Sequence, residues 1–217
     1  LKPKNLTFEA AATVPTSDDE PRLQAAAPNE IYLPLEINSQ DSSLNRLRER
    51  WLQACKQFDR RGAEQALTDA FSLFPAETVC VELLQKGMSQ LGRGWDQGEV
   101  TILQEHFASA LTLQRLEMLI AAAPPPHRPE KILIGCAPDD HHTFMPMLLT
   151  FLLRRAGFDV IYLGANVAAF EFEQTLAQLA PQLVIISAQR LHTAAALKEV
   201  AEKVTAANVL LAYGGSV

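Results

Sequence analysis

Hydrophobic residues in the first half of the chain recur at the three- and four-residue spacing of amphipathic helices. The first stripe follows the N-capping residues Asp41, Ser42 and Ser43. The pattern predicts four helices with short connections, which is typical of a four-helix bundle, over residues 43–123. These helices are expected at residues 44–58, 63–74, 81–95 and 101–123, with the glycines Gly92, Gly94 and Gly98 ending the third.

A proline-rich linker, residues 124–130, separates this region from a different pattern, because consecutive prolines cannot continue a helix. Beyond it, short and almost continuously apolar runs alternate with helical stretches, as expected for a parallel sheet covered by helices on both faces. The sequence therefore predicts an α/β fold with a Rossmann-like, flavodoxin-type domain at residues 131–217. Its strands are expected at residues 131–136, 159–163, 183–187 and 209–213, and its helices at 145–156, 169–179 and 193–205.

Residues 1–42 show neither pattern. They contain five prolines and the acidic run Asp18-Asp19-Glu20, a composition that predicts a flexible tether. The chain begins at Leu1 and offers four strands where such sheets commonly have five or more. We therefore expect a fragment that lacks an upstream domain and is truncated after the fourth strand.

The composition is that of a globular protein, since 48% of the 217 residues are hydrophobic and 20% are charged. The net charge of −6 has the wrong sign for a chain whose main surface binds DNA, so any DNA contact is expected through a domain absent from this chain. No apolar run is long enough to span a membrane. The scattered Cys55, Cys80 and Cys136 indicate buried thiols in a reducing compartment, and hence a cytoplasmic protein.

The first candidate site is the Asp140-His141-His142 run, which follows the first predicted strand. Ligands of open α/β sheets bind at the carboxyl ends of the strands, and a histidine oriented by a carboxylate is a common metal ligand. The alternative is a polar turn in which Asp139 or Asp140 caps the next helix, and the local pattern alone favours that role. His141 is expected to face solvent, and His192, after the third strand, to lie on the same rim.

The second candidate is Trp95 followed, after nine residues, by Glu105 and His106. Taken singly, Trp95 is interpreted as a core or interface aromatic and His106 as a hydrogen-bonded histidine of the bundle. Only the combination, placed upstream of the Asp-x-His sequence, points to a particular site.

Together these elements resemble the cobalamin-binding region of the methionine-synthase-like corrinoid proteins, and within that group the light-sensing MerR-type repressors of the CarH and LitR type. The resemblance covers about residues 43 to 217. Its Asp-x-His element marks the wider superfamily, whereas the Trp-x9-Glu-His element is shared by the light-sensing and related regulatory branches.

The resemblance implies a role for each of these residues. His142 is the lower axial ligand of cobalt, and Asp140 tunes it by hydrogen bonding. The nucleotide tail of the cofactor lies in a groove near Ser187 and the Gly214-Gly215 turn. The upper face of the corrin, with its adenosyl group, is covered by Trp95, Glu105 and His106.

Three positions depart from the family pattern. Met145 replaces the glycine of Asp-x-His-x-x-Gly, where its side chain is expected to crowd the corrin or the tail groove. Gln189 stands in the Ser187-Ala188-Gln189 run where the family has Leu or Thr, and Asp96 follows Trp95 where some photosensors have a histidine. These departures keep a haem or a bilin open as alternatives to adenosylcobalamin.

The resemblance therefore implies a sensory module of a light-responsive transcriptional regulator, without turnover of its own. An alternative, enzymatic role is that of a corrinoid carrier subunit that passes methyl groups between methyltransferases. A third is a binding protein whose site has drifted towards haem, a bilin or no cofactor. Because the light-sensing relatives assemble through these domains, a homo-oligomer is also expected.

Overall fold

The computed structural model describes residues 9–10 and 42–215, so almost all of the predicted tether at residues 1–42 lies outside the described residues. The chain forms two compact units that meet in sequence between Val100 and Thr101. Within the described residues, one unit comprises residues 42–100 and the other residues 101–215 together with the strand at residues 9–10. The predicted domain boundaries themselves stay a prediction.

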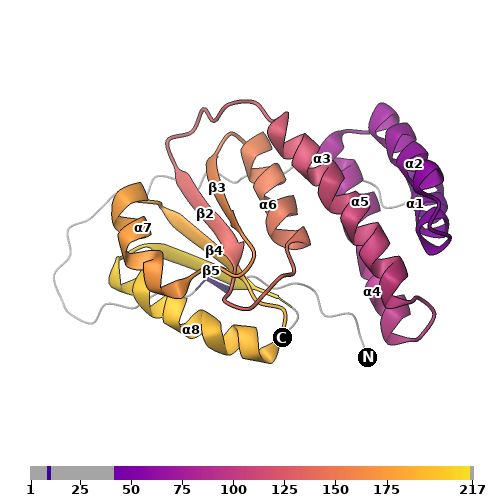
Figure 1. The fold of residues 1–217 in the computed structure, drawn as a ribbon. Helices are drawn as coiled ribbons and strands as arrows, with labels where there is room; N and C mark the ends of the chain where they lie inside the picture. The colour runs from indigo at the N-terminus through magenta and orange to yellow at the C-terminus, as the bar shows by residue number, and fades with distance from the viewer. Residues whose placement is uncertain (1–8, 11–41, 216–217) are drawn as a thin grey trace. The chain divides into compact units, whose positions relative to one another are not determined.

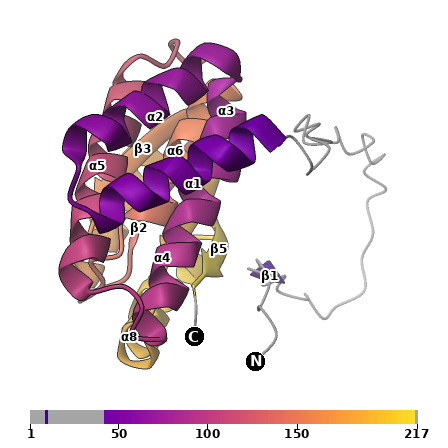
Figure 2. The ribbon, with the colours of Figure 1, turned by 90° about the vertical axis from the view of Figure 1, so that its right-hand side faces the viewer.

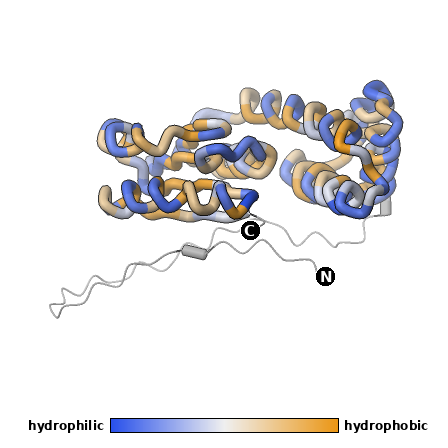
Figure 3. Tube along the Cα trace, turned by 60° about the horizontal axis from the view of Figure 1, so that its bottom comes forward, coloured by the Kyte–Doolittle hydropathy of each residue, from blue (hydrophilic) through white to orange (hydrophobic). Residues whose placement is uncertain are grey.

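The first unit begins with two helices, α1 (Ser42–Lys56) and α2 (Arg60–Leu73), which lie side by side (Figure 2). The turn between them places Phe58 in the left-handed region, with φ of 55°. Asp59 then caps α2, because its carboxylate accepts the backbone N–H of Gly62 at 2.9 Å. The two predicted helices are confirmed, and their hydrophobic and hydrophilic residues interleave along each helix (Figure 3).

The third predicted helix is continuous but not uniform. It consists of α3 (Ala76–Thr78), the π-helical stretch η1 (Val79–Gln85) and α4 (Lys86–Asp96). The expectation that Gly92 and Gly94 help to end it is wrong, because α4 runs through both glycines. A Cβ at Gly94 would lie 2.7 Å from Val100, so this glycine makes room for the chain beyond the helix. Gly98, with φ of 75°, supplies the turn after α4.

The second unit begins with α5 (Ile102–Ala121), which packs against α6 (Phe144–Arg155). A capping box starts α5: the Thr101 hydroxyl accepts the Gln104 N–H, and the Gln104 side chain accepts the Thr101 N–H. The predicted fourth helix is therefore confirmed, and it begins near Thr101 as expected, with Thr101 as its N-cap.

The remaining elements form the predicted parallel sheet (Figure 1). Its strands are β2 (Lys131–Cys136), β3 (Asp159–Gly164), β4 (Leu183–Ser187) and β5 (Leu210–Gly214), in the order β5-β4-β2-β3. The short β1 (Glu9–Ala10) pairs antiparallel with β5. The connecting helices are α6, then η2 (Ala169–Glu171) with α7 (Phe172–Leu179), and α8 (Leu191–Ala206). The predicted α/β fold class is confirmed.

Helices cover the two faces of the sheet separately. Leu133 of β2 belongs to a core with Phe172 of α7 and Val200 of α8, whereas its neighbours Ile132 and Ile134 belong to a second core that Leu149 of α6 covers. Because successive strand residues point to opposite faces, α7 and α8 lie on one face and α6 on the other. The chain reverses its direction of winding between β2 and β4, so the carboxyl ends of these two strands define the crevice where such folds bind ligands.

Burial follows the position of each strand in the sheet. The central strands β2 and β4 are buried along most of their length, as their apolar sequences predicted. The same expectation is wrong for β5, where Leu210 is 69% exposed and no residue of the strand is buried. Cys55, Cys80 and Cys136 are buried free thiols, as expected.

Among the helices that the structure describes, none is both long and apolar enough to cross a membrane.

The close contact of Gly87 with the fully buried Trp51 generates a prediction about stability. A Cβ at Gly87 would lie 2.7 Å from the Trp51 ring, so we expect Gly87→Ala to lower the free energy of unfolding by about 1–3 kcal/mol through overpacking. Gly92 lies in the same helix with no atom within 4 Å of such a Cβ, and Gly92→Ala is expected to raise stability by about 0.5–1 kcal/mol. Urea unfolding measures both; equal effects of the two substitutions would contradict the packing argument.

Candidate functional site

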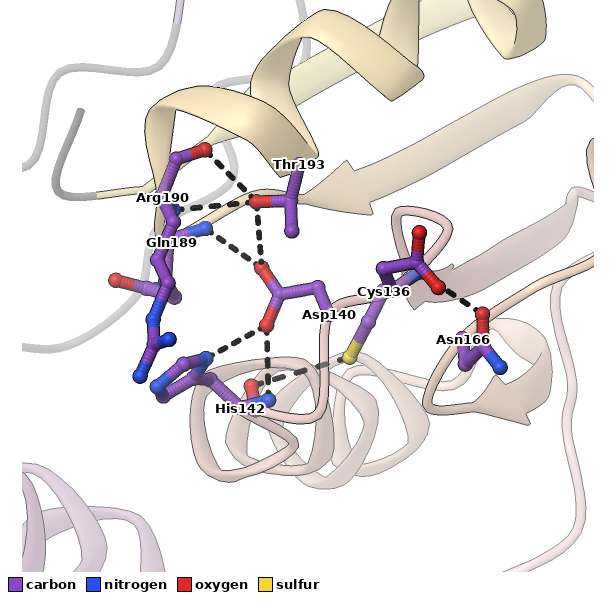
Figure 4. A network of polar contacts seen from close by, with 8 residues as sticks. Cys136, Asp140, His142, Asn166, Gln189, Arg190 and Thr193 are labelled. Carbon is purple, nitrogen blue, oxygen red and sulfur yellow. Dashed lines mark hydrogen bonds and ion pairs between the residues drawn. The ribbon is translucent and has the colours of Figure 1, made fainter.

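The candidate site is the loop between β2 and α6, at the carboxyl end of the central strand. Asp140 is buried within this loop, and its two carboxylate oxygens serve different neighbours (Figure 4). Oδ1 accepts the backbone N–H of His142 at 2.9 Å and lies 2.7 Å from Nδ1 of the His142 ring. The Asp140 side chain is fully buried, whereas that of His142 is 51% exposed.

This geometry determines which ring nitrogen of His142 is available to a metal. An ionised carboxylate only accepts hydrogen bonds, so Nδ1 carries the proton that it donates to Asp140. Nε2 of the neutral ring then keeps its lone pair, and the carboxylate both fixes the ring and raises its basicity as a ligand.

The second oxygen of Asp140 joins the β2 loop to the start of α8. Oδ2 accepts the backbone N–H of Gln189 at 2.6 Å and lies 3.4 Å from the Thr193 hydroxyl. The alternative interpretation of Asp140 as the cap of α6 is therefore wrong. Thr143 occupies the N-cap position of α6 and makes no side-chain capping bond, and Asp139 is exposed in the turn before it.

The pKa of Asp140 is held below its ordinary value. Burial alone would raise this pKa, but the hydrogen bonds from the His142 backbone and ring and from the Gln189 N–H outweigh it. The carboxylate is therefore ionised in neutral solution, as its role of double acceptor requires.

The loop is also tied to the end of β3 and to the sheet beneath it. The Asn166 side chain accepts the Asp139 N–H at 2.8 Å, and the Asn166 N–H donates to the Asp140 carbonyl at 2.9 Å. The Cys136 thiol lies 3.8 Å from the carbonyl oxygen of His142 (Figure 4). Contacts from three strand ends therefore hold the His142 loop.

A narrow groove beside this loop brings together four of the predicted site residues. It is lined by Met145 from the first turn of α6, Ser187 at the end of β4, Gly214 at the end of β5 and the following Gly215, together with Gln189. The groove holds a cavity of about 20 Å³, which is room for about one water. Its predicted role in holding a cofactor tail stays a prediction.

Gly215 is required by the protein itself. A Cβ at this position would lie 1.6 Å from the carbonyl oxygen of Ala188, so the chain passes directly against the loop after β4. This backbone contact alone excludes any other residue at position 215, whether or not a cofactor tail lies beside it.

The predicted upper cap residues come from two other helices, α4 and α5. Trp95 is near the end of α4 in the unit of residues 42–100 and is 49% exposed. Of its two interpretations, core or interface aromatic, the first is therefore wrong and the second stays a prediction. On α5, the Glu105 carboxylate lies 2.9 Å from Nδ1 of His106 and also accepts the Ser109 hydroxyl at 2.6 Å, while the His106 ring is exposed. Their contact with a cofactor stays a prediction.

Sequence reasoning missed the partners of Asp140. Gln189 was considered only as a departure from the family pattern, and Thr193 and Asn166 were not considered at all. Gln189 acts through its backbone N–H, which carries no sequence signal. Asn166, whose φ of 50° is unusual for most residues, sits in a turn after a strand and offered the one recognisable signal. His141 and His192 are exposed, as expected for His141.

The side chains at this site fit a metal ion whose other ligands come from its own cofactor. Within the described part of the chain, no three His, Cys, Asp or Glu side chains gather to hold a metal ion. An exposed imidazole with a buried carboxylate behind it supplies a single axial ligand, which is what a metal in a macrocycle needs from a protein. Fold and site thus define a doubly wound α/β protein with one oriented, half-exposed histidine at the crevice of its sheet.

Comparison with known proteins agrees with this class. Residues 47–120 and residues 130–217 each match a family model described as a B12 binding domain. The chain belongs to the B12-binding domain family, and its cofactor is a corrinoid of the cobalamin class.

Two curated relatives come from Myxococcus xanthus. The HTH-type transcriptional repressor CarA is 30% identical over 142 residues, covering 65% of this chain and 48% of the repressor. The HTH-type transcriptional repressor CarH is 28% identical over 140 residues, covering 64% of this chain and 46% of that protein. The chain thus spans about half the length of the curated relatives it matches.

A solved structure shares the fold at lower identity. The monomethylamine corrinoid protein of Methanosarcina barkeri superposes with a TM-score of 0.61 at 18% identity, covering 76% of this chain and 77% of its own. This likeness supports the observed architecture.

The buried Asp140 carboxylate generates a prediction about acid stability. We expect Asp140→Asn to lower the free energy of unfolding in neutral solution by about 1–3 kcal/mol, because the charged acceptor is lost. Because the folded-state pKa is lowered, this contribution is fully present above the ordinary pKa of about 4 and is lost as the pH falls through the folded-state value.

Urea unfolding of the wild type and of Asp140→Asn across this pH range measures the difference. Asp139→Asn is the matched control, because Asp139 is an exposed neighbour and asparagine also tolerates its φ of 62°. A stability difference between wild type and Asp140→Asn that did not shrink in acid would contradict the role of the ionised carboxylate.

Proposed function

We propose that this chain is the cobalamin-binding sensory module of a cytoplasmic, light-responsive transcriptional regulator. In this proposal His142 is the lower axial ligand of adenosylcobalamin, and Asp140 holds the histidine in the ligating tautomer. Trp95, Glu105 and His106 keep their predicted role of covering the upper face of the corrin.

The observation that carries the proposal is the pairing of a buried carboxylate with an exposed imidazole at the crevice of the sheet. The 2.7 Å contact between Asp140 Oδ1 and His142 Nδ1 fixes the ring before any cofactor arrives, which lowers the entropy cost of ligation. The His142 ring, which is half-exposed, can then reach a metal through Nε2 without rearrangement of the loop.

When bound, adenosylcobalamin supplies a cobalt–carbon bond that light cleaves, and the protein provides ligation and enclosure. The half-exposed Trp95 offers a large, flat apolar surface of the kind that encloses an adenosyl group. Such shielding suits a sensor, in which the upper ligand stays in place until light releases it.

The similarity to two transcriptional repressors favours a regulator over a methyl carrier. The corrinoid protein of Methanosarcina barkeri supports only the fold at its 18% identity, whereas the repressors match at 30% and 28% identity. With a net charge of −6, this chain would contact DNA through another domain, and we propose that the module itself forms a homo-oligomer.

Replacing the proposed ligand tests the assignment directly. We expect His142→Ala to abolish the absorption spectrum of histidine-ligated cobalamin and to weaken cobalamin binding at least tenfold, because no other side chain is oriented by Asp140 in the same way. His141→Ala is the matched control, since His141 is the exposed neighbouring imidazole and carries no bond to Asp140. Loss of the ligated spectrum in the His141 variant instead would move the ligand to that residue.

Illumination separates the sensor from the carrier. The protein purified with adenosylcobalamin is expected to change its absorption spectrum and its oligomer size under green light. Protein loaded with aquocobalamin is the control, because it has no cobalt–carbon bond and should respond in neither measurement. An unchanged spectrum and oligomer under light, together with methyl transfer to an added acceptor, would support the carrier, and a haem or bilin absorption band in the purified protein would support a drifted site.

A further inference from the structure

We infer that Met145 makes this site select corrinoids by the size of their lower tail, admitting short tails more readily than the complete nucleotide tail. The inference rests on the proposed function, because it takes His142 to be the lower axial ligand. It concerns a different feature, however, namely the groove beside that ligand.

The groove has the right position for a lower tail. A tail leaves the corrin on the same face as the lower ligand, so it must lie beside His142 once the histidine occupies that position. The groove lies next to that position, because Gln189, which lines it, donates its N–H to the Asp140 carboxylate that holds the His142 ring. Its lining is almost entirely apolar, with Ile134, Ile185 and Leu149 among its walls.

As it stands, the groove has less room than a nucleotide tail needs, so a complete tail enters only when the Met145 side chain moves aside. The room for about one water contrasts with the benzimidazole, ribose and phosphate that end the tail of cobalamin. One wall is the sheet, where β2, β4 and β5 are held by their ladder of hydrogen bonds, and Gly215 is held against Ala188. The groove cannot widen on that side without breaking the sheet.

Helix α6 is packed in place on the other side of the groove. Its residues Leu148 and Phe151 are almost fully buried, and the helix also packs against α5. Pro146 restricts the backbone of the first turn, and its carbonyl accepts the Thr150 hydroxyl at 2.8 Å. The half-buried side chain of Met145 is therefore the part of the lining whose size sets the width of the groove.

The test compares two corrinoids across variants of Met145. Aquocobalamin carries the complete nucleotide tail, and diaquocobinamide ends in a short amino alcohol. In cobalamin, but not in cobinamide, a benzimidazole must leave cobalt before the histidine can bind, and this step costs free energy. The cost is a property of cobalamin and is therefore the same for every protein variant. The measured quantity is therefore the ratio of the Kd of cobalamin to the Kd of cobinamide, and its change between variants.

We expect Met145→Ala and Met145→Ser each to lower this ratio at least tenfold relative to the wild type, mainly through tighter binding of cobalamin. Met145→Leu keeps the volume of the side chain and should keep the wild-type ratio. Met118→Ala, at an exposed position of α5, is the control for loss of a methionine elsewhere.

The possible results distinguish the inference about Met145 from the proposed function. An equal ratio in the wild type and in both small variants would overturn the inference while leaving the proposed function intact. A drop in Met145→Leu as large as in Met145→Ala would also overturn it, because volume would then not be the cause. Failure of the wild type to bind either corrinoid would overturn the proposed function, and the inference with it.

Discussion

The buried carboxylate of Asp140 is the interaction on which the rest of the site depends. One oxygen fixes the His142 ring and the other holds the Gln189 N–H, so a single side chain joins the loop after β2 to the loop after β4. A carboxylate buried without such partners would be strongly unfavourable, and these hydrogen bonds are what keep its pKa low. The same contacts that stabilise the charge therefore orient the ligand.

The sequence predicted the positions of the strands closely, because these depend on the local pattern of hydrophobic residues. The central strands β2 and β4 were predicted at their observed positions, and β3 and β5 came within one residue. Exposure of Leu210 could not be predicted, because the apolar run is the same whether or not a helix covers that face of the strand. The partners of Asp140 lie 49 and 53 residues away and act partly through the backbone, so no local pattern reveals them.

The small residues near the site serve two different purposes. Gly135 and Gly215 are required by the protein's own packing, since a Cβ would lie 2.7 Å from Val167 in the first case and 1.6 Å from Ala188 in the second. Position 145 is different, because its side chain faces the groove and the protein tolerates a methionine there. Positions that face a ligand are free to vary with the ligand, whereas positions that face the backbone are not.

The Cys136 thiol lies directly under the His142 loop, 3.8 Å from the His142 carbonyl, and burial raises its pKa. A thiol in this state reacts with an alkylating reagent only while the loop above it is displaced. Cys136 is thus an intrinsic reporter of how often the segment that carries the ligand lifts away from the sheet, and the rate of its chemical modification measures that opening without an added probe.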